Sequence, residues 1–512
     1  MKFFISDTTK TKDSFGKWYY WHDEKCKKII KDNYIVFYYG YAIDDSLEET
    51  IVERWEKIHT LNGSYCCCKI TKDKAEIVTD YFDTSKIFYS YHKGIEITNS
   101  FKLLSLDQKD IDLAEVSRRQ RLPNTYTQSG VFTGGNWQNY HPFSEREHKY
   151  KERCPTASKT VFKSVYQLQA QHKLVVDKNI YQKRLHDIHR DIQDALQSSS
   201  KFGTINELQD YIFDRMKKHS STIKQSYKHV ACSLSEGIDS SLQNLFFPEA
   251  RQYSYHVTNP ETVPLDYKKT LYKDLNFSDV IIKEFDNNDS QVYARQYATD
   301  PTAYYFDFLP LYPLIKDADV KPDILLVGSN ADEMFMHRVD YLASEVYEIM
   351  YRRDPTTASA KTREWFDQNS NCYGTRKNIH EEYPYWDDKF LNENDSDSYW
   401  HSCPNHFVES LSLKASCGLY SRHLSHELDT EVTSLYQDKS ICFEVMKIPL
   451  EQRVEVTKDC SIQKSIMKNG FGIDFKTPYK DNASYNTYPP VSIWYKTTLP
   501  YVLKDHLSSE ML

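Results

Sequence analysis

Glycine is scarce in this chain of 512 residues, with only 14 copies, which is less than half of the usual share of about 7%. Tyrosine (40 copies) and phenylalanine (25 copies) are abundant. Because bulky residues have replaced small ones, each remaining glycine marks a position where the backbone needs freedom or a close approach. Gly237 and Gly328 are two such positions, and both fall inside motifs described below.

Long apolar runs are also missing. No segment approaches 18 consecutive apolar residues, and the apolar part of MKFFISDTTK is too short for a signal peptide. The 11 cysteines are odd in number and lack the spacing of a disulfide framework, which favours a reducing compartment. We expect a cytoplasmic protein that has no membrane partner.

A basic surplus is absent, since the formal net charge is −8. Binding to nucleic acid or to an anionic membrane requires a dense basic face, so neither is expected as the main partner. We interpret the basic run KCKKIIKD, residues 25–32, as a solvated helix face. No GxxxxGKS segment occurs, which excludes a Walker-type ATP site, and GVFTGG at 130–135 lacks the flanks of a dinucleotide site.

The segment ACSLSEGIDSSLQNLFF, residues 231–247, predicts a strand, a small polar loop and a helix. Hydroxyl groups, a glycine and the unpaired N–H groups of a helix N-terminus together favour a phosphate cradle, and Asp239 adds a hard oxygen ligand for Mg²⁺. The predicted phosphate-binding residues are Ser235, Gly237, Ser240 and Ser241. The alternative is an ordinary strand-to-helix turn with a serine or aspartate cap.

A second segment, DILLVGSNADEMF at 323–335, predicts another buried strand followed by Gly328 and the acidic pair Asp332 and Glu333. If both strands belong to one parallel sheet, their carboxyl ends lie on the same rim, where open α/β sheets bind ligands. Asp239 and Asp332 would then share one Mg²⁺ on a triphosphate.

These two segments resemble the ATP-pyrophosphatase half of asparagine synthetase, whose loop reads SGGxDSS and whose second motif reads GEGADE before an aromatic residue. ELDTEVTSLYQD at 427–438 is similar to the family's ExRxPFLD segment. The matching positions are Glu431, Tyr436 and Asp438. FGIDFKTPYKDNA at 471–483 stands where the family carries a pyrophosphate-contacting lysine; the resemblance places that role on Lys480, with Lys476 as the alternative.

The N-terminal third resembles the glutaminase domain of the same family. The similar segments are LNGSYCCCKI, IVTDYFDTSKIFYSY, GIEITNSFKLL and TVFKSVYQLQAQHKLVV. The resemblance implies a glutaminase-like α+β domain over 1–185, an αββα sandwich of the Ntn-hydrolase type. It implies a synthetase-like domain over 200–512, with a parallel α/β sheet of the PP-loop type and a largely helical C-terminal part.

Several positions depart from the family pattern. Lys2 stands where the nucleophilic cysteine would follow the initiator methionine, so glutamine hydrolysis is not expected. Cys66 to Cys68 lie in an apolar strand pattern and are interpreted as core. Further departures are Thr79 and Thr433 in place of arginines, Glu236 in place of a glycine, Ser329 in place of the active-site glutamate, and Asn330 in place of the next glycine. Asparagine tolerates a left-handed backbone well.

The resemblance implies ATP-dependent amide formation through an acyl-adenylate, with ATP and Mg²⁺ as cofactors. Lys480 and Ser329 occupy the catalytic positions, and the substrate would be a small-molecule or peptide carboxylate with ammonia or an amine as donor. Two alternatives stay open: a catalytically impaired descendant that binds nucleotide or a protein partner, and a PP-loop enzyme that modifies nucleobases or transfer RNA. A homodimer is one possible assembly.

A metal site elsewhere is a separate hypothesis. His401, Cys403 and His406 in WHSCPNHF are ligand types for zinc, but no matching pair with zinc spacing follows.

Overall fold

The structure is a computed structural model. It describes residues 2–112 except 83, 92 and 107–109; residue 160 and residues 162–186 except 169–170; residues 191, 194–195 and 198–257; and residues 264–285, 311–335, 428–448 and 460–476. Most of the C-terminal part that was predicted to be helical lies outside these ranges, as do Lys480, His401, Cys403 and His406.

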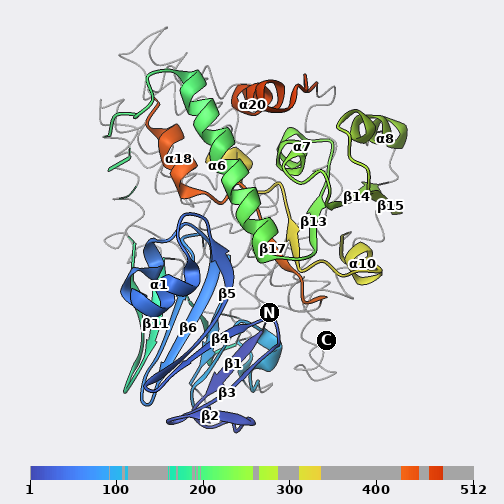
Figure 1. The fold of residues 1–512 in the computed structure, drawn as a ribbon. Helices are drawn as coiled ribbons and strands as arrows, with labels where there is room; N and C mark the ends of the chain where they lie inside the picture. The colour runs from blue at the N-terminus through green and yellow to red at the C-terminus, as the bar shows by residue number, and fades with distance from the viewer. Residues whose placement is uncertain are drawn as a thin grey trace, which may run out of the picture.

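The N-terminal region contains two antiparallel sheets of six strands each (Figure 1). In spatial order, the first consists of β10 (Val165–Gln167), β8 (Phe88–Ser90), β9 (Glu96–Thr98), β1 (Phe3–Ser6), β3 (Trp18–His22) and β2 (Asp13–Phe15). The second consists of β12 (Ile180–Arg184), β11 (His172–Val176), β7 (Ala75–Thr79), β6 (Gly63–Thr71), β5 (Tyr34–Ala42) and β4 (Lys27–Lys31).

The two sheets pack face to face through one apolar core, in which the rings of Tyr20 and Phe37 lie 4.9 Å apart. Helix α1 (Leu47–Glu53) and the 3-10 helix η1 (Trp55–Thr60) cover the outer face of the second sheet. Successive residues of a strand face opposite sides. Cys66 and Cys68 therefore belong to the core between the sheets, whereas Cys67 packs against the helices.

The interpretation of residues 25–32 as a helix face is wrong. Lys27–Lys31 form strand β4 at the edge of the second sheet, paired with β5, and their side chains are mostly exposed. The run is solvated, as expected, but charge alone does not select a helix. Lysines on an edge strand also discourage pairing with another chain.

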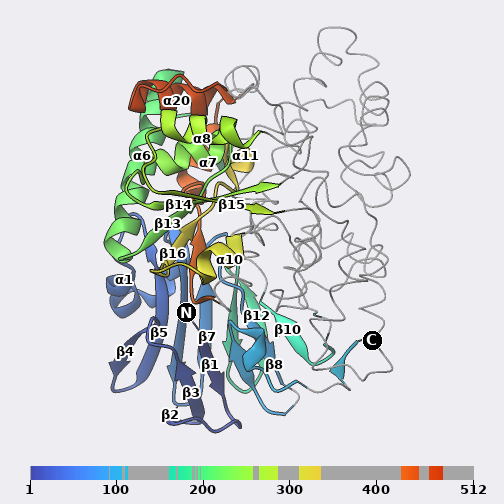
Figure 2. The ribbon, with the colours of Figure 1, turned by 90° about the vertical axis from the view of Figure 1, so that its right-hand side faces the viewer.

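A third sheet of five parallel strands lies beyond the other two (Figure 2). Its order is β15 (Val280–Phe285), β14 (Arg251–Val257), β13 (Val230–Ser233), β16 (Ile324–Leu326) and β17 (Glu431–Thr433). The associated helices are α6 (Ile205–Ser226), α7 (Ile238–Leu245), α8 (Leu265–Asp274), α10 (Leu311–Lys316), α11 (Ala331–Met334), α18 (Lys439–Met446) and α20 (Ser461–Phe471). Thr204 and Glu207 form a capping box that starts α6.

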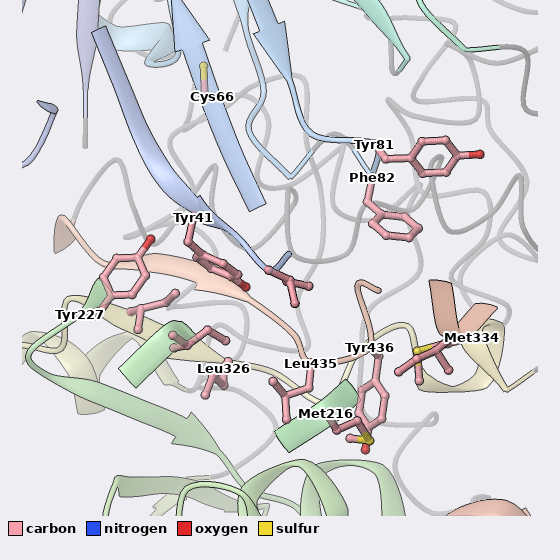
Figure 3. Packing of buried hydrophobic residues seen from close by; sticks show 14 of the residues in the cluster. Tyr41, Cys66, Tyr81, Phe82, Met216, Tyr227, Leu326, Met334, Leu435 and Tyr436 are labelled. Atoms are coloured by element: carbon pink, nitrogen blue, oxygen red, sulfur yellow. The ribbon is translucent and has the colours of Figure 1, made fainter. Parts of the chain in front are cut away.

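The antiparallel and parallel sheets are consistent with a two-domain α/β protein. A continuous apolar cluster joins them (Figure 3). Tyr41 of β5 packs edge-on against Tyr227, with ring centroids 6.2 Å apart. Among the described residues, no helix has both the length and the apolar character needed to cross a membrane.

Candidate functional site

The loop between β13 and α7 is held in its conformation by hydrogen bonds to two of its own hydroxyl groups. The Oγ atoms of Ser235 and Ser240 are 2.8 Å apart, and the amide of Ser235 donates to Ser240 Oγ at 3.1 Å. The amide of Gly237 donates to Ser235 Oγ at 3.2 Å. Gly237 is the N-cap residue of α7 and provides no side-chain cap, and the N-terminus of a helix is the end that favours an anion.

The second predicted segment lies directly against this loop. Strands β13 and β16 are parallel neighbours, so their carboxyl ends share one rim. A Cβ atom on Gly328 would lie 2.8 Å from the backbone nitrogen of Ser240. Only glycine, which has no Cβ atom, avoids this clash. Asn330 has a φ of +75°, as expected for an asparagine in place of a glycine.

The third segment that resembles the family, within residues 427–438, also contacts α7. The hydroxyl of Tyr436 donates to the carbonyl oxygen of Asp239 at 2.6 Å. The buried Oε1 of Gln243 accepts hydrogen bonds from Ser434 Oγ at 3.2 Å and from the Leu435 amide at 3.0 Å. Three segments that are far apart in the sequence therefore meet at the first two turns of one helix.

The predicted metal ligands are positioned only in part. Asp239 lies in the first turn of α7, where Gln463 Nε2 approaches its Oδ1 at 3.5 Å. Asp332 lies in α11, which follows β16, but its side chain is outside the described part of the chain. In the described ranges no group of three or more His, Cys, Asp or Glu residues is arranged to hold a metal ion. A site shared by the two aspartates stays a prediction.

The other predicted site residues have different surroundings. Ser329 follows Gly328 on the same rim, and its carbonyl accepts from Ser434 Oγ at 2.9 Å. Ser241 is fully buried in α7. Lys476 is exposed, and its Nζ lies 3.7 Å from Asp474 Oδ2. Because Lys480 is not described, the choice between the two lysines stays open.

Glu236 has a specific partner that the sequence did not indicate. Its carboxylate lies 3.0 Å from Nζ of Lys268 in α8. The same ammonium group donates to the carbonyl oxygen of Tyr255 in β14 at 3.0 Å. The charge of Glu236 is thus compensated inside the protein.

Glu431 does not lie at this rim. It begins β17 opposite Ile324, at the amino end of the sheet, and accepts a hydrogen bond from the Tyr227 hydroxyl. Burial raises the pKa of Glu431 to about 7. The resemblance places it in the third motif, but in this structure it is a half-buried residue whose carboxylate accepts from Tyr227, away from the rim.

Thr433, at the position of the family's arginine, joins a buried network instead. Its Oγ1 lies 3.1 Å from the Tyr41 hydroxyl, which lies 2.7 Å from Nε2 of His219. Burial lowers the pKa of His219 to about 4, so its imidazole is neutral at physiological pH.

Asp438 links the third segment to the N-terminal sheets. It is completely buried and caps α18 by accepting from the Ser440 amide at 2.9 Å. The guanidinium of Arg215 donates to its Oδ2 at 2.8 and 2.9 Å, and the Asn62 amide donates to its Oδ1. Arg215 also donates to Asp44, beyond the end of β5. A buried carboxylate with this many donors fixes the conformation of the third segment.

The three adjacent cysteines are core residues, as predicted. Cys66, Cys67 and Cys68 are at most 1% exposed. Burial raises the pKa of each thiol well above its usual range, so none forms a thiolate readily.

No family model matches the chain, and no curated protein matches it. Among solved structures it is similar to a glutamine phosphoribosylpyrophosphate amidotransferase from B. subtilis, complexed with ADP and GMP. The identity is 7% and the TM-score 0.18, over 59% of this chain and 63% of that chain. The chain therefore matches less than two thirds of that neighbour, and a likeness this distant carries no functional argument.

Proposed function

We propose that this protein is an ATP-dependent amide ligase of the AMP-forming type, similar to asparagine synthetase. The observation that supports the proposal best is the convergence of three separate segments on the start of α7. Tyr436 bonds to the backbone of Asp239, and Gly328 packs against that of Ser240. An ordinary strand-to-helix turn would not require these contacts.

The residues around the loop fit a magnesium–nucleotide complex. The hydroxyl groups of Ser235 and Ser240, which bond to each other in this structure, would turn to donate to phosphate oxygens together with the N-terminal amides of α7. Asp239 provides a carboxylate, which is the ligand type that Mg²⁺ prefers. ATP and Mg²⁺ would be held by Ser235, Gly237, Ser240 and Asp239, with Asp332 as the proposed second carboxylate. Ser241, predicted with them, is fully buried and would support the loop from inside α7.

In the proposed reaction a carboxylate oxygen attacks the α-phosphorus of ATP, and pyrophosphate leaves. An amine or ammonia then attacks the acyl carbon, loses a proton and displaces AMP, which leaves an amide. The chain would orient the phosphates through the loop hydroxyl groups, and Lys480 would neutralise the leaving pyrophosphate. Ser329 would lie beside the reacting carboxylate. The buried thiols of Cys66 to Cys68 are unsuited to glutamine hydrolysis, so we propose a free amine as donor.

A second candidate function is nucleotide binding without catalysis. Ser329 favours it, because a serine stands where the family resembled in the sequence carries its active-site glutamate.

The test is pyrophosphate release from MgATP with a panel of carboxylic acids, including aspartate, first with ammonia and then with glutamine alone. We expect release with one acid and ammonia, and its loss in Asp239→Asn. Asp266→Asn is the matched control, since Asp266 occupies the first turn of α8 beside another strand of the same sheet. Nucleotide binding without release on any acid would favour the second candidate, and turnover with glutamine alone would contradict the proposed donor.

A further inference from the structure

The Glu236–Lys268 ion pair joins the proposed phosphate loop to helix α8. Glu236 precedes Gly237, the N-cap of α7, and its side chain is 24% exposed. The side chain of Lys268 is only 9% exposed. Within the described ranges the ammonium has one ion-pair partner, Glu236, and one carbonyl acceptor, Tyr255. A cation this deeply buried requires an anion beside it.

Local electrostatics favour an anion at this place, whether it belongs to the protein or to a ligand. The open N-terminus of α7 stabilises negative charge, and the Lys268 ammonium adds a full positive charge. The nearby His256 is buried, and burial, followed by repulsion from Lys268, lowers the pKa of its imidazole. Among the described residues of α8, Lys268 is the lysine that an ion pair joins to the loop.

We propose that Lys268 is a phosphate-binding residue of this site and that Glu236 is an internal anion that competes with the nucleotide for it. On binding, a phosphate oxygen takes the position of the Glu236 carboxylate on the ammonium group. The inference rests on the proposed nucleotide site and adds a specificity-determining pair to it. Glu236 then sets the affinity, because each binding event must first separate a partly buried ion pair.

The experiment measures binding of MgATP, and separately of magnesium pyrophosphate, to the full-length chain by titration calorimetry. Glu236→Gln keeps the size of the side chain and removes its charge, so it should tighten binding about fivefold. Lys268→Met should weaken binding about tenfold or more, because a charged donor to phosphate is lost. Lys268→Arg, which keeps the charge, should retain most of the affinity.

Glu249→Gln is the matched control. Glu249 pairs with Lys224 at 2.8 Å, next to the other end of the parallel sheet. Its substitution changes the net charge by the same amount and should leave binding unchanged. Thermal unfolding of each variant shows whether it is folded.

The outcomes separate this inference from the proposed function. If the wild-type protein binds MgATP and Glu236→Gln binds it no more tightly, Glu236 does not compete with the nucleotide, but the ligase proposal is unaffected. Binding by Glu236→Gln alone would support the competition and contradict catalysis by the native chain. Binding by neither protein would overturn both.

Discussion

Replacing Arg215 by methionine should destabilise the protein strongly, because it removes the positive charge that compensates a buried carboxylate. Asp438 is 0% exposed, and its Oδ2 accepts two hydrogen bonds from the Arg215 guanidinium. Methionine retains the length of the side chain but not the charge. Asp44, the other partner of Arg215, keeps Lys218 at 2.9 Å, so the penalty falls on Asp438. Removing one member of such a buried pair costs about 3 to 5 kcal/mol.

Arg251→Met is the matched control for this prediction. Arg251 Nε lies 2.9 Å from Asp279 Oδ2, but the two side chains are 32% and 47% exposed. An exposed pair contributes less than about 1 kcal/mol. The free energy of unfolding, measured by chemical denaturation with tryptophan fluorescence, should therefore fall several times further in Arg215→Met.

A double-mutant cycle tests the cause. Asp438→Asn removes the buried charge, so Arg215→Met should cost much less in that background. Equal costs in the two backgrounds, or an Arg215→Met effect no larger than that of Arg251→Met, would refute the argument that a buried ion pair joins Asp438 to Arg215 of helix α6.

Three further predictions concern single residues. The pKa of Glu431 is raised from 4.5 to about 7 in the folded protein. Its contribution to the free energy of unfolding, about 3 kcal/mol, is therefore fully present below pH 4.5 and is lost as the pH rises through 7. Glu431→Gln should abolish that part of the pH dependence of unfolding, and an unchanged profile would contradict it. The pKa of His219 is lowered from 6.5 to about 4. The stability that its neutral imidazole contributes above pH 6.5 is therefore lost as the pH falls through 4. In His219→Gln the free energy of unfolding should fall less at acidic pH. Gly328→Ala should cost about 1 to 3 kcal/mol and weaken MgATP binding, because its Cβ would meet the Ser240 backbone. Gly203→Ala, whose Cβ would lie 3.4 Å from the nearest atom, should have a much smaller effect on thermal unfolding.

The sequence was sufficient to predict the local features of the site. A β-type run followed by small polar residues predicted β13, the loop and α7, and the same pattern predicted β16 and the turn at Gly328. Asn330 was expected in a left-handed conformation and has one. The burial of Cys66 to Cys68 followed from their apolar strand pattern. These features depend on near neighbours in the chain.

Contacts between distant segments could not be predicted in this way. Lys268 resembles the other lysines of α8 in the sequence, and only the packing of that helix brings it to Glu236. Asp438 and Arg215 are 223 positions apart, and no local pattern couples them. The basic residues of β4 were wrongly predicted to lie on a helix, because exposed lysines are compatible with either a helix face or an edge strand.

Titration of the full-length protein with MgATP, compared with Asp239→Asn and Asp266→Asn, tests the central claim most directly. The account predicts saturable binding by the wild-type chain and by Asp266→Asn, and strongly reduced binding by Asp239→Asn. Equal binding by all three proteins, or none by the wild type, would contradict a nucleotide site at the start of α7.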